Sequence, residues 1–118
     1  MANPNIVNIT SLYGNLAIQS VSSITANIVQ NASSSGQAYR VNFLSISNVS
    51  TNNYTITAEV NVAGSNAALL KNAVIPANSA LTIIAKDTSF YLTENSSIQL
   101  YTSQNSAFQA VCSWEQLS

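Results

Sequence analysis

The chain has 118 residues, a formal net charge of −1 and 6% charged side chains, whereas an ordinary globular protein has about 25%. Its 47% of apolar residues is sufficient for one domain with a hydrophobic core that needs no metal or disulfide. Its three Lys and Arg residues exclude a nucleic-acid surface built on a basic patch, and the low charge excludes a coiled coil and a highly charged disordered tail.

Several chemical groups are missing from the sequence. The chain has no histidine, the side chain that most often serves as a general base or metal ligand near neutral pH. It has one cysteine, Cys112, which excludes an intrachain disulfide. Its first residues do not resemble a signal peptide, and no apolar run approaches the roughly 18 residues of a membrane span. We therefore expect a protein made in a cytoplasm that binds neither a membrane nor nucleic acid.

Residues 1–15 differ from the rest of the chain and predict an extended N-terminal arm. Four asparagines and Gly14 interrupt a short aliphatic run in this segment. An arm with exposed aliphatic side chains gains stability by pairing with the edge of a neighbouring subunit's sheet. The candidate contact residues in the arm are Asn3, Pro4, Ile6, Val7 and Ile9.

From residue 16 to residue 118, apolar and polar residues alternate with a period of two, which is typical of strands with one buried face. Turn-forming residues separate these runs at intervals of about eight to twelve residues. The pattern predicts one antiparallel β-sandwich of about eight strands, either immunoglobulin-like or jelly-roll. The expected strands are 16–19, 24–29, 39–43, 54–62, 69–75, 81–84, 98–102 and 108–115.

Two hairpins can be aligned from this alternation. One pairs residues 98–102 with 108–112, and the other pairs 39–43 with 58–62. Both registers put the apolar residues of the two strands on the same face of a sheet. The first hairpin gives six inner positions, which are Ile98, Leu100, Thr102, Phe108, Ala110 and Cys112.

The apolar phase moves by one residue after Phe43, to Leu44 and Ile46. In a regular strand, a shift of one residue turns every later side chain to the opposite face. We therefore predict a β-bulge near Phe43–Leu44, which returns Leu44 and Ile46 to the core opposite Ile56 and Tyr54.

The ionisable side chains do not form a catalytic or metal-binding pattern. The four carboxylates, Glu59, Asp87, Glu94 and Glu115, fall in turns or on outer faces, each apart from the others. Cys112 lies on the apolar phase of its strand and has no histidine to activate it. We therefore expect no enzyme activity, no cofactor and no metal.

The outer faces of the expected strands are rich in hydroxyl and amide groups, such as those of Thr55 and Thr57. These groups cost less to remove from water than charged groups do, so the outer faces suit contacts between subunits. Tyr101 is also expected to point outward. Its ring suits an interface anchor, and it suits equally a surface on which a sugar stacks.

Five segments form a pattern of strands and turns found in one protein family. They are Ala2–Thr10, the tyrosine-led strand Tyr39–Asn48, the Pro-Ala turn and strand Ile75–Ile84, the Tyr-Leu-x-Glu segment Tyr91–Ile98, and the ending Val111–Ser118. This pattern resembles small virion structural proteins of tailed phages, which are common in marine and cyanobacterial viruses. The resemblance covers most of the chain and includes no catalytic motif.

The resemblance implies a non-enzymatic structural component of a tailed-phage virion. Within that class we expect an accessory or decoration (cement) protein of the head, which forms a homo-oligomer and contacts capsid, neck or tail subunits. Two alternatives stay open. One is a structural protein of the neck or tail, and the other is a β-sandwich module that binds a carbohydrate or a host receptor.

Overall fold

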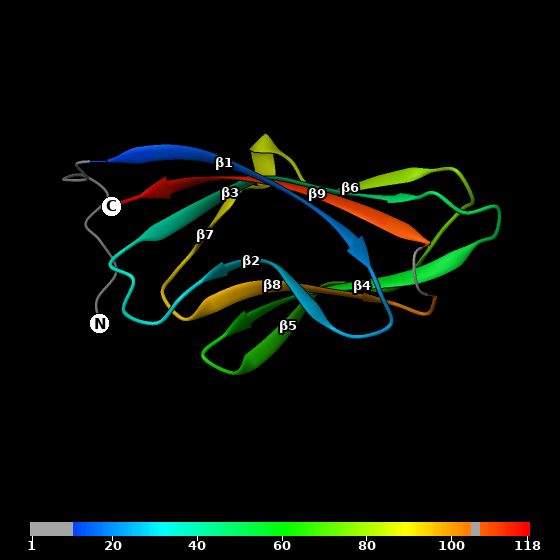
Figure 1. Ribbon diagram of the computed structural model, residues 1–118, viewed down its shortest axis with the longest axis horizontal. Coiled ribbons are helices and arrows are strands. Elements are labelled where there is room, and N and C mark those ends of the chain that lie inside the picture. Colours follow the sequence, from blue (N-terminus) through cyan, green and yellow to red (C-terminus); the bar gives the residue numbers. More distant parts are fainter. Residues whose placement is uncertain (1–10, 105–106) are drawn as a thin grey trace.

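The computed structural model describes residues 11–104 and 107–118, which form nine strands and one short 3-10 helix, η2 (Lys86–Thr88) (Figure 1). The strands are β1 (Leu12–Val21), β2 (Ala26–Asn31), β3 (Ala38–Asn48), β4 (Tyr54–Val62), β5 (Ser65–Ile75), β6 (Ala80–Ile84), β7 (Phe90–Leu92), β8 (Ser96–Thr102) and β9 (Phe108–Leu117).

The strands form two antiparallel sheets stacked face to face (Figure 1). One sheet has the order β1-β9-β3-β6, with β7 also paired to β3, and the other has the order β2-β8-β4-β5. Because β6 and β7 pair with successive parts of β3, the two sheets have eight strand positions. This strand order is that of a jelly roll. The predicted β-sandwich is therefore confirmed, and the jelly roll is the form that it takes.

Both predicted hairpins are wrong, because each would join strands that lie in different sheets. Strand β8 pairs with β2 and β4, while β9 pairs with β1 and β3. In the same way, β3 and β4 belong to opposite sheets. Among the described strands, the one hairpin between sequence neighbours is β4–β5. Its turn residues Ala63 and Gly64 have φ angles of 51° and 92°, as a tight two-residue hairpin turn requires.

The bulge predicted in β3 is confirmed. The register of β3 against β9 shifts by one residue just before Phe43, and the ladder against β6 shifts again after Leu44. Leu44 and Ile46 are consequently fully buried. They lie opposite Cys112 and Ala110 of β9, so the partners expected on β4 are wrong. Those expected partners were Ile56 and Tyr54.

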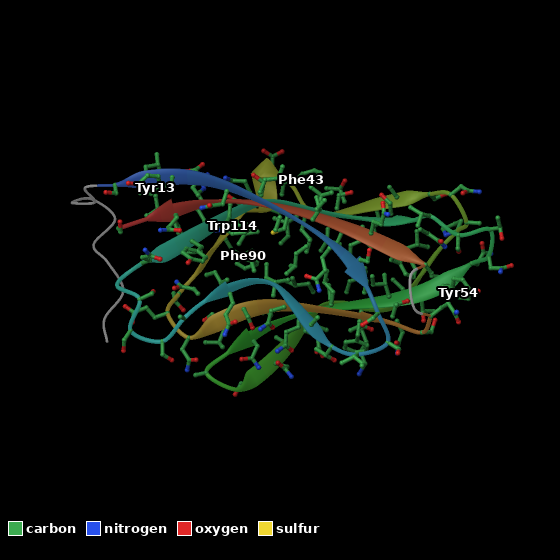
Figure 2. All side chains as sticks on the ribbon, viewed as in Figure 1. Tyr13, Phe43, Tyr54, Phe90 and Trp114 are labelled. Carbon is green, nitrogen blue, oxygen red and sulfur yellow. The ribbon has the colours of Figure 1, made fainter. Side chains whose placement is uncertain are left out.

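The hydrophobic core fills the layer between the two sheets (Figure 2). Its largest side chain is Phe108, which is 0% exposed. The six inner positions predicted from the sequence are all buried, although three belong to each sheet. Crossing to the opposite sheet buries the same side chains as a hairpin would, which explains why the predicted faces hold while the predicted pairings fail.

The first strand begins earlier than expected. Strand β1 starts at Leu12 and keeps ten consecutive register pairs with β9, and Ser11 continues the ladder by exchanging two backbone hydrogen bonds with Ser118. Residues 12–15, which the arm was expected to include, are therefore part of the sheet. Gly14 was expected to interrupt the strand, but it pairs with Glu115 of β9 and the strand continues through it. The rest of the proposed arm, residues 1–10 with all five of its candidate contacts, lies outside the described residues.

Two buried asparagines connect the sheets near opposite ends of β3. Asn31 of β2 donates a hydrogen bond from Nδ2 to the carbonyl oxygen of Leu92 in β7, at 3.0 Å. Asn48 of β3 donates from Nδ2 to the carbonyl oxygen of Ile75 in β5, at 2.8 Å. Both side chains are at most 1% exposed, so these bonds are shielded from water and hold the two layers together.

Candidate functional site

On β1 the usual alternation is reversed, because large aliphatic side chains point to solvent while polar side chains point inward. The side chains of its even-numbered residues point to the outer face of the five-stranded sheet, where Leu12, Leu16 and Ile18 are 58%, 69% and 78% exposed. The odd-numbered positions include the polar residues Asn15 and Gln19, and both are less exposed than their aliphatic neighbours. A strand normally turns its more apolar face to the core. We call the outward-facing set the β1 surface, which comprises Leu12, Gly14, Leu16, Ile18 and Ser20.

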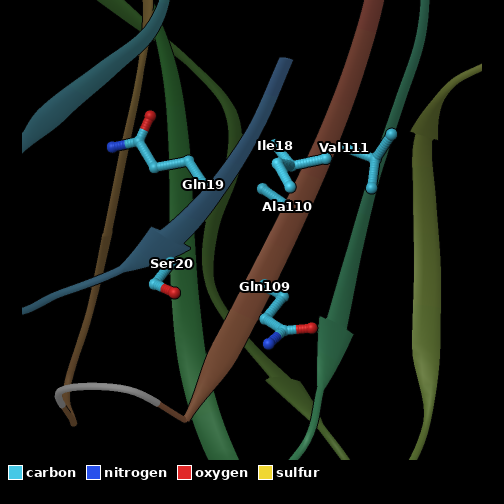
Figure 3. Close-up of a pocket in the computed structure, with 6 residues that line it drawn as sticks. All are labelled: Ile18, Gln19, Ser20, Gln109, Ala110 and Val111. Atoms are coloured by element: carbon cyan, nitrogen blue, oxygen red, sulfur yellow. The ribbon is translucent and has the colours of Figure 1, made fainter. Parts of the chain in front are cut away.

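The β1 surface continues onto the neighbouring strands. Ile18 lies beside Val111 of β9, and the two side chains flank a surface depression of about 330 Å³ (Figure 3). Leu16 lies beside Ser113, whose neighbour on the other side is Phe43, 38% exposed. Leu16, Ile18, Val111 and Phe43 form a mainly apolar strip across three strands of the outer face, and Ser113 lies between Leu16 and Phe43.

The outer face becomes polar beyond this strip. Arg40, Asn42 and Glu115 line a second depression together with Phe43, with a volume of about 390 Å³. Within it, Asn42 Nδ2 donates a hydrogen bond to Glu115 Oε1 at 3.0 Å. An apolar strip with a polar border is the usual composition of a protein contact surface.

The three contact residues predicted in the sandwich lie together in the other sheet. Thr55, Thr57 and Tyr101 line a depression of about 130 Å³, which is well below the roughly 300 Å³ of a typical ligand cleft. Thr57 is 1% exposed, so its expected exposure is wrong. The cause is Asn72 of β5, whose left-handed backbone (φ 47°) brings its N–H within 3.0 Å of Thr57 Oγ1. Thr55 and Tyr101 stay partly exposed.

The described part of the chain contains no cluster of metal-ligating side chains and no accessible thiolate. In residues 11–104 and 107–118, no three His, Cys, Asp or Glu residues lie close enough together to hold a metal ion. Cys112 is fully buried, as predicted, and burial raises the pKa of its thiol to about 12. The thiol is therefore protonated at neutral pH and inaccessible as a nucleophile. Within the same residues, no helix has the length and apolar character to cross a membrane.

No protein-family model matches the chain, and no curated protein is a significant match to it. The class of protein is therefore defined by the fold and its surface. It is a jelly-roll β-sandwich whose first strand presents three large aliphatic side chains to the outside.

Proposed function

We propose that this protein is a non-enzymatic subunit of a larger protein assembly and that the β1 surface is part of the contact. The observation that supports this most strongly is the inverted strand β1. Its ten residues contain no charge, and its aliphatic face is turned away from the core. Because exposed apolar patches lower solubility, a soluble protein keeps one mainly where a partner covers it.

The assembly that we propose is a tailed-phage virion, with the chain as an accessory or decoration protein of the head. The support is the sequence resemblance of its five segments to small virion structural proteins. The jelly roll is compatible with this role, since it recurs in viral capsid proteins, and it is compatible with the carbohydrate-binding alternative, since it also recurs in lectins. A density map of intact particles would test the location, and density for the chain at the neck or tail would contradict the head assignment.

Association through this surface is expected to depend little on salt. The β1 strand has no charged residue, and the whole chain has seven. Salt weakens contacts by screening charges, so few interactions here are open to it. We expect light scattering of the purified chain to give the same degree of association, within about twofold, at roughly 0.05 M and 0.5 M sodium chloride.

Two results would contradict this account in different ways. Dissociation by modest salt would show that charges hold the contact, which contradicts the proposed mechanism. A chain that stays monomeric at high concentration and also fails to bind virions would contradict the proposed function itself.

A further inference from the structure

We propose that a second copy of this chain occupies the free edge of β1, forming a two-fold symmetric antiparallel strand pair with Leu16 at the axis. This inference rests on the proposed function and names a partner for the backbone edge that borders the β1 surface. The pair would extend the five-stranded sheet of one copy into that of the other. Such a contact uses the same surface patch on both subunits, as two-fold symmetry requires.

The described residues form four sheet edges, and the edge at β1 is the one that is both long and free of register shifts. Strand β2 has a register shift after Asn27, and β5 has two shifts and carries Lys71. The edge beside β3 is divided between the short strands β6 and β7. Bulges, lysines and short strands are the usual protections against edge-to-edge pairing. Strand β1 has none of them, since its ladder with β9 runs without a shift.

The backbone of β1 shows which groups face the free edge. Ser11 and Ser118 exchange both of their backbone hydrogen bonds, at 3.0 and 3.1 Å. In an antiparallel ladder such pairs alternate with pairs that make no bonds to each other. Because the register continues unbroken, the odd-numbered residues of β1 bond to β9. The N–H and C=O groups of the even-numbered residues, which are those of the β1 surface, therefore point to the free edge.

One self-pairing register uses all of these free groups. With Leu16 opposite its own copy, Gly14 lies opposite Ile18 and Leu12 lies opposite Ser20. This register forms five hydrogen-bonded pairs, and each pair exchanges two bonds, which gives ten backbone hydrogen bonds. Moving the two-fold axis by one residue in either direction leaves four such pairs. The Leu16-centred register is therefore the one that satisfies the edge completely.

The side chains also fit this register. Ile18 of one copy lies opposite Gly14 of the other, and a side-chain atom added at Gly14 would meet nothing within 4 Å in the isolated chain. The space beside the glycine can thus receive the isoleucine. The two Leu16 side chains meet across the axis and shield each other from water. Because the strand has no charged residue, two copies approach without repulsion.

The size of the contact indicates a weak dimer. A strand of ten residues is about 34 Å long, and an edge about 10 Å high then buries on the order of 700 Å² over both copies. Interfaces below roughly 1,200 Å² belong to weak or transient complexes. We therefore expect the isolated chain to dimerise in a concentration-dependent manner, at micromolar concentrations or above.

The test uses opposite charges at the axis. In Leu16→Glu and in Leu16→Lys, two like charges would face each other across the two-fold axis, so each variant alone is expected to be monomeric by sedimentation velocity. An equimolar mixture pairs Glu with Lys and is expected to restore the dimer. Leu16 is 69% exposed, so both variants are expected to keep the wild-type fold by circular dichroism. The matched control pair is Val74→Glu and Val74→Lys on β5, where Val74 is 63% exposed and the dimer should persist.

A cysteine scan tests the register independently of charge. Leu16→Cys is expected to form a covalent dimer with a short bifunctional thiol reagent, since the Cβ atoms of a directly opposed hydrogen-bonded pair lie about 5.5 Å apart, slightly beyond the reach of a disulfide. Ile18→Cys is expected not to, because residue 18 is opposite residue 14. Preferential cross-linking through residue 18, or dimers that survive both charged Leu16 variants, would overturn the proposal. A monomeric wild-type chain that still binds virions would overturn this inference and leave the proposed function standing.

Discussion

Replacing Asn48 with aspartate is expected to lower the free energy of unfolding by about 3 kcal/mol or more. The Nδ2 group of Asn48 donates to the carbonyl oxygens of Asn52 at 2.9 Å and of Ile75 at 2.8 Å. In the variant a carboxylate oxygen would face both carbonyl oxygens. The side chain is 1% exposed, so water cannot stabilise the negative charge.

The aspartate substitution removes the two hydrogen bonds that Asn48 donates and keeps the two that it accepts. Asn48 Oδ1 accepts hydrogen bonds from the N–H of Ser50 at 2.9 Å and from its hydroxyl at 2.7 Å, and a carboxylate can accept both. The measurement is urea denaturation near neutral pH, or a thermal scan, in which the loss corresponds to roughly 10 °C.

Asn53→Asp is the matched control. Asn53 is exposed, and its Oδ1 accepts a hydrogen bond from the N–H of Ala77 at 2.9 Å, a bond that an aspartate can also accept. We expect this variant to stay within about 0.5 kcal/mol of the wild-type protein. Equal stability of the Asn48 and Asn53 variants would show that the bond between the sheets contributes nothing.

The buried thiol of Cys112 is expected to make the protein lose stability at alkaline pH. Its pKa is about 12 in the folded protein, against 9.0 for an unperturbed thiol, because burial disfavours the thiolate. The folded state therefore keeps its proton at pH values where the unfolded state has lost it. At pH values below 9 both states keep the thiol proton, so the thiol does not lower the free energy of unfolding. As the pH rises from 9 to 12 the unfolded state loses this proton first, and the free energy of unfolding falls. At pH 10.5 the loss is about 2 kcal/mol.

The measurement compares wild-type protein with Cys112→Ala by urea denaturation at about pH 8 and pH 10.5. The variant retains every other ionisable group, so the difference between the two pH dependences belongs to the thiol. Cys112→Ala also leaves a small cavity, but its cost enters at both pH values and cancels. If Cys112→Ala lost as much free energy of unfolding between these two pH values as the wild-type protein does, the alkaline loss would not come from the Cys112 thiol.

The sequence predicts the faces of the strands better than their neighbours. Strand β4 has the expected bounds, Tyr54–Val62, and the bulge before Leu44 was visible as a change of phase. A period of two records which side chains are buried, but it contains no information on which strand lies alongside. Strand β7 was missed because three residues, Phe90–Leu92, are too few to show a period. The roles of Asn31 and Asn48 were also missed, because buried asparagines have the same local pattern as turn residues.

The candidate site was harder to predict because it depends on sheet order. Whether β1 lies at an edge follows from the long-range pairing with β9, and no local pattern encodes it. Leu16 and Ile18 indicate an ordinary half-buried strand when they are considered alone. Thr57 is hidden by Asn72, fifteen residues later, through a backbone conformation that alternation does not anticipate. The one feature of the sequence that points to a contact surface here is an uncharged strand with several aliphatic side chains near the start of the chain.

Residue-resolved amide hydrogen exchange of β1 tests most directly whether this edge is the assembly contact. In the monomer, the odd-numbered amides bond to β9 and should exchange slowly, while those of Leu12, Leu16 and Ile18 should exchange fast. When light scattering shows association, we expect the even-numbered amides to slow by about tenfold or more while the odd-numbered ones stay unchanged. Unchanged exchange at Leu16 and Ile18 in the associated protein would contradict the account.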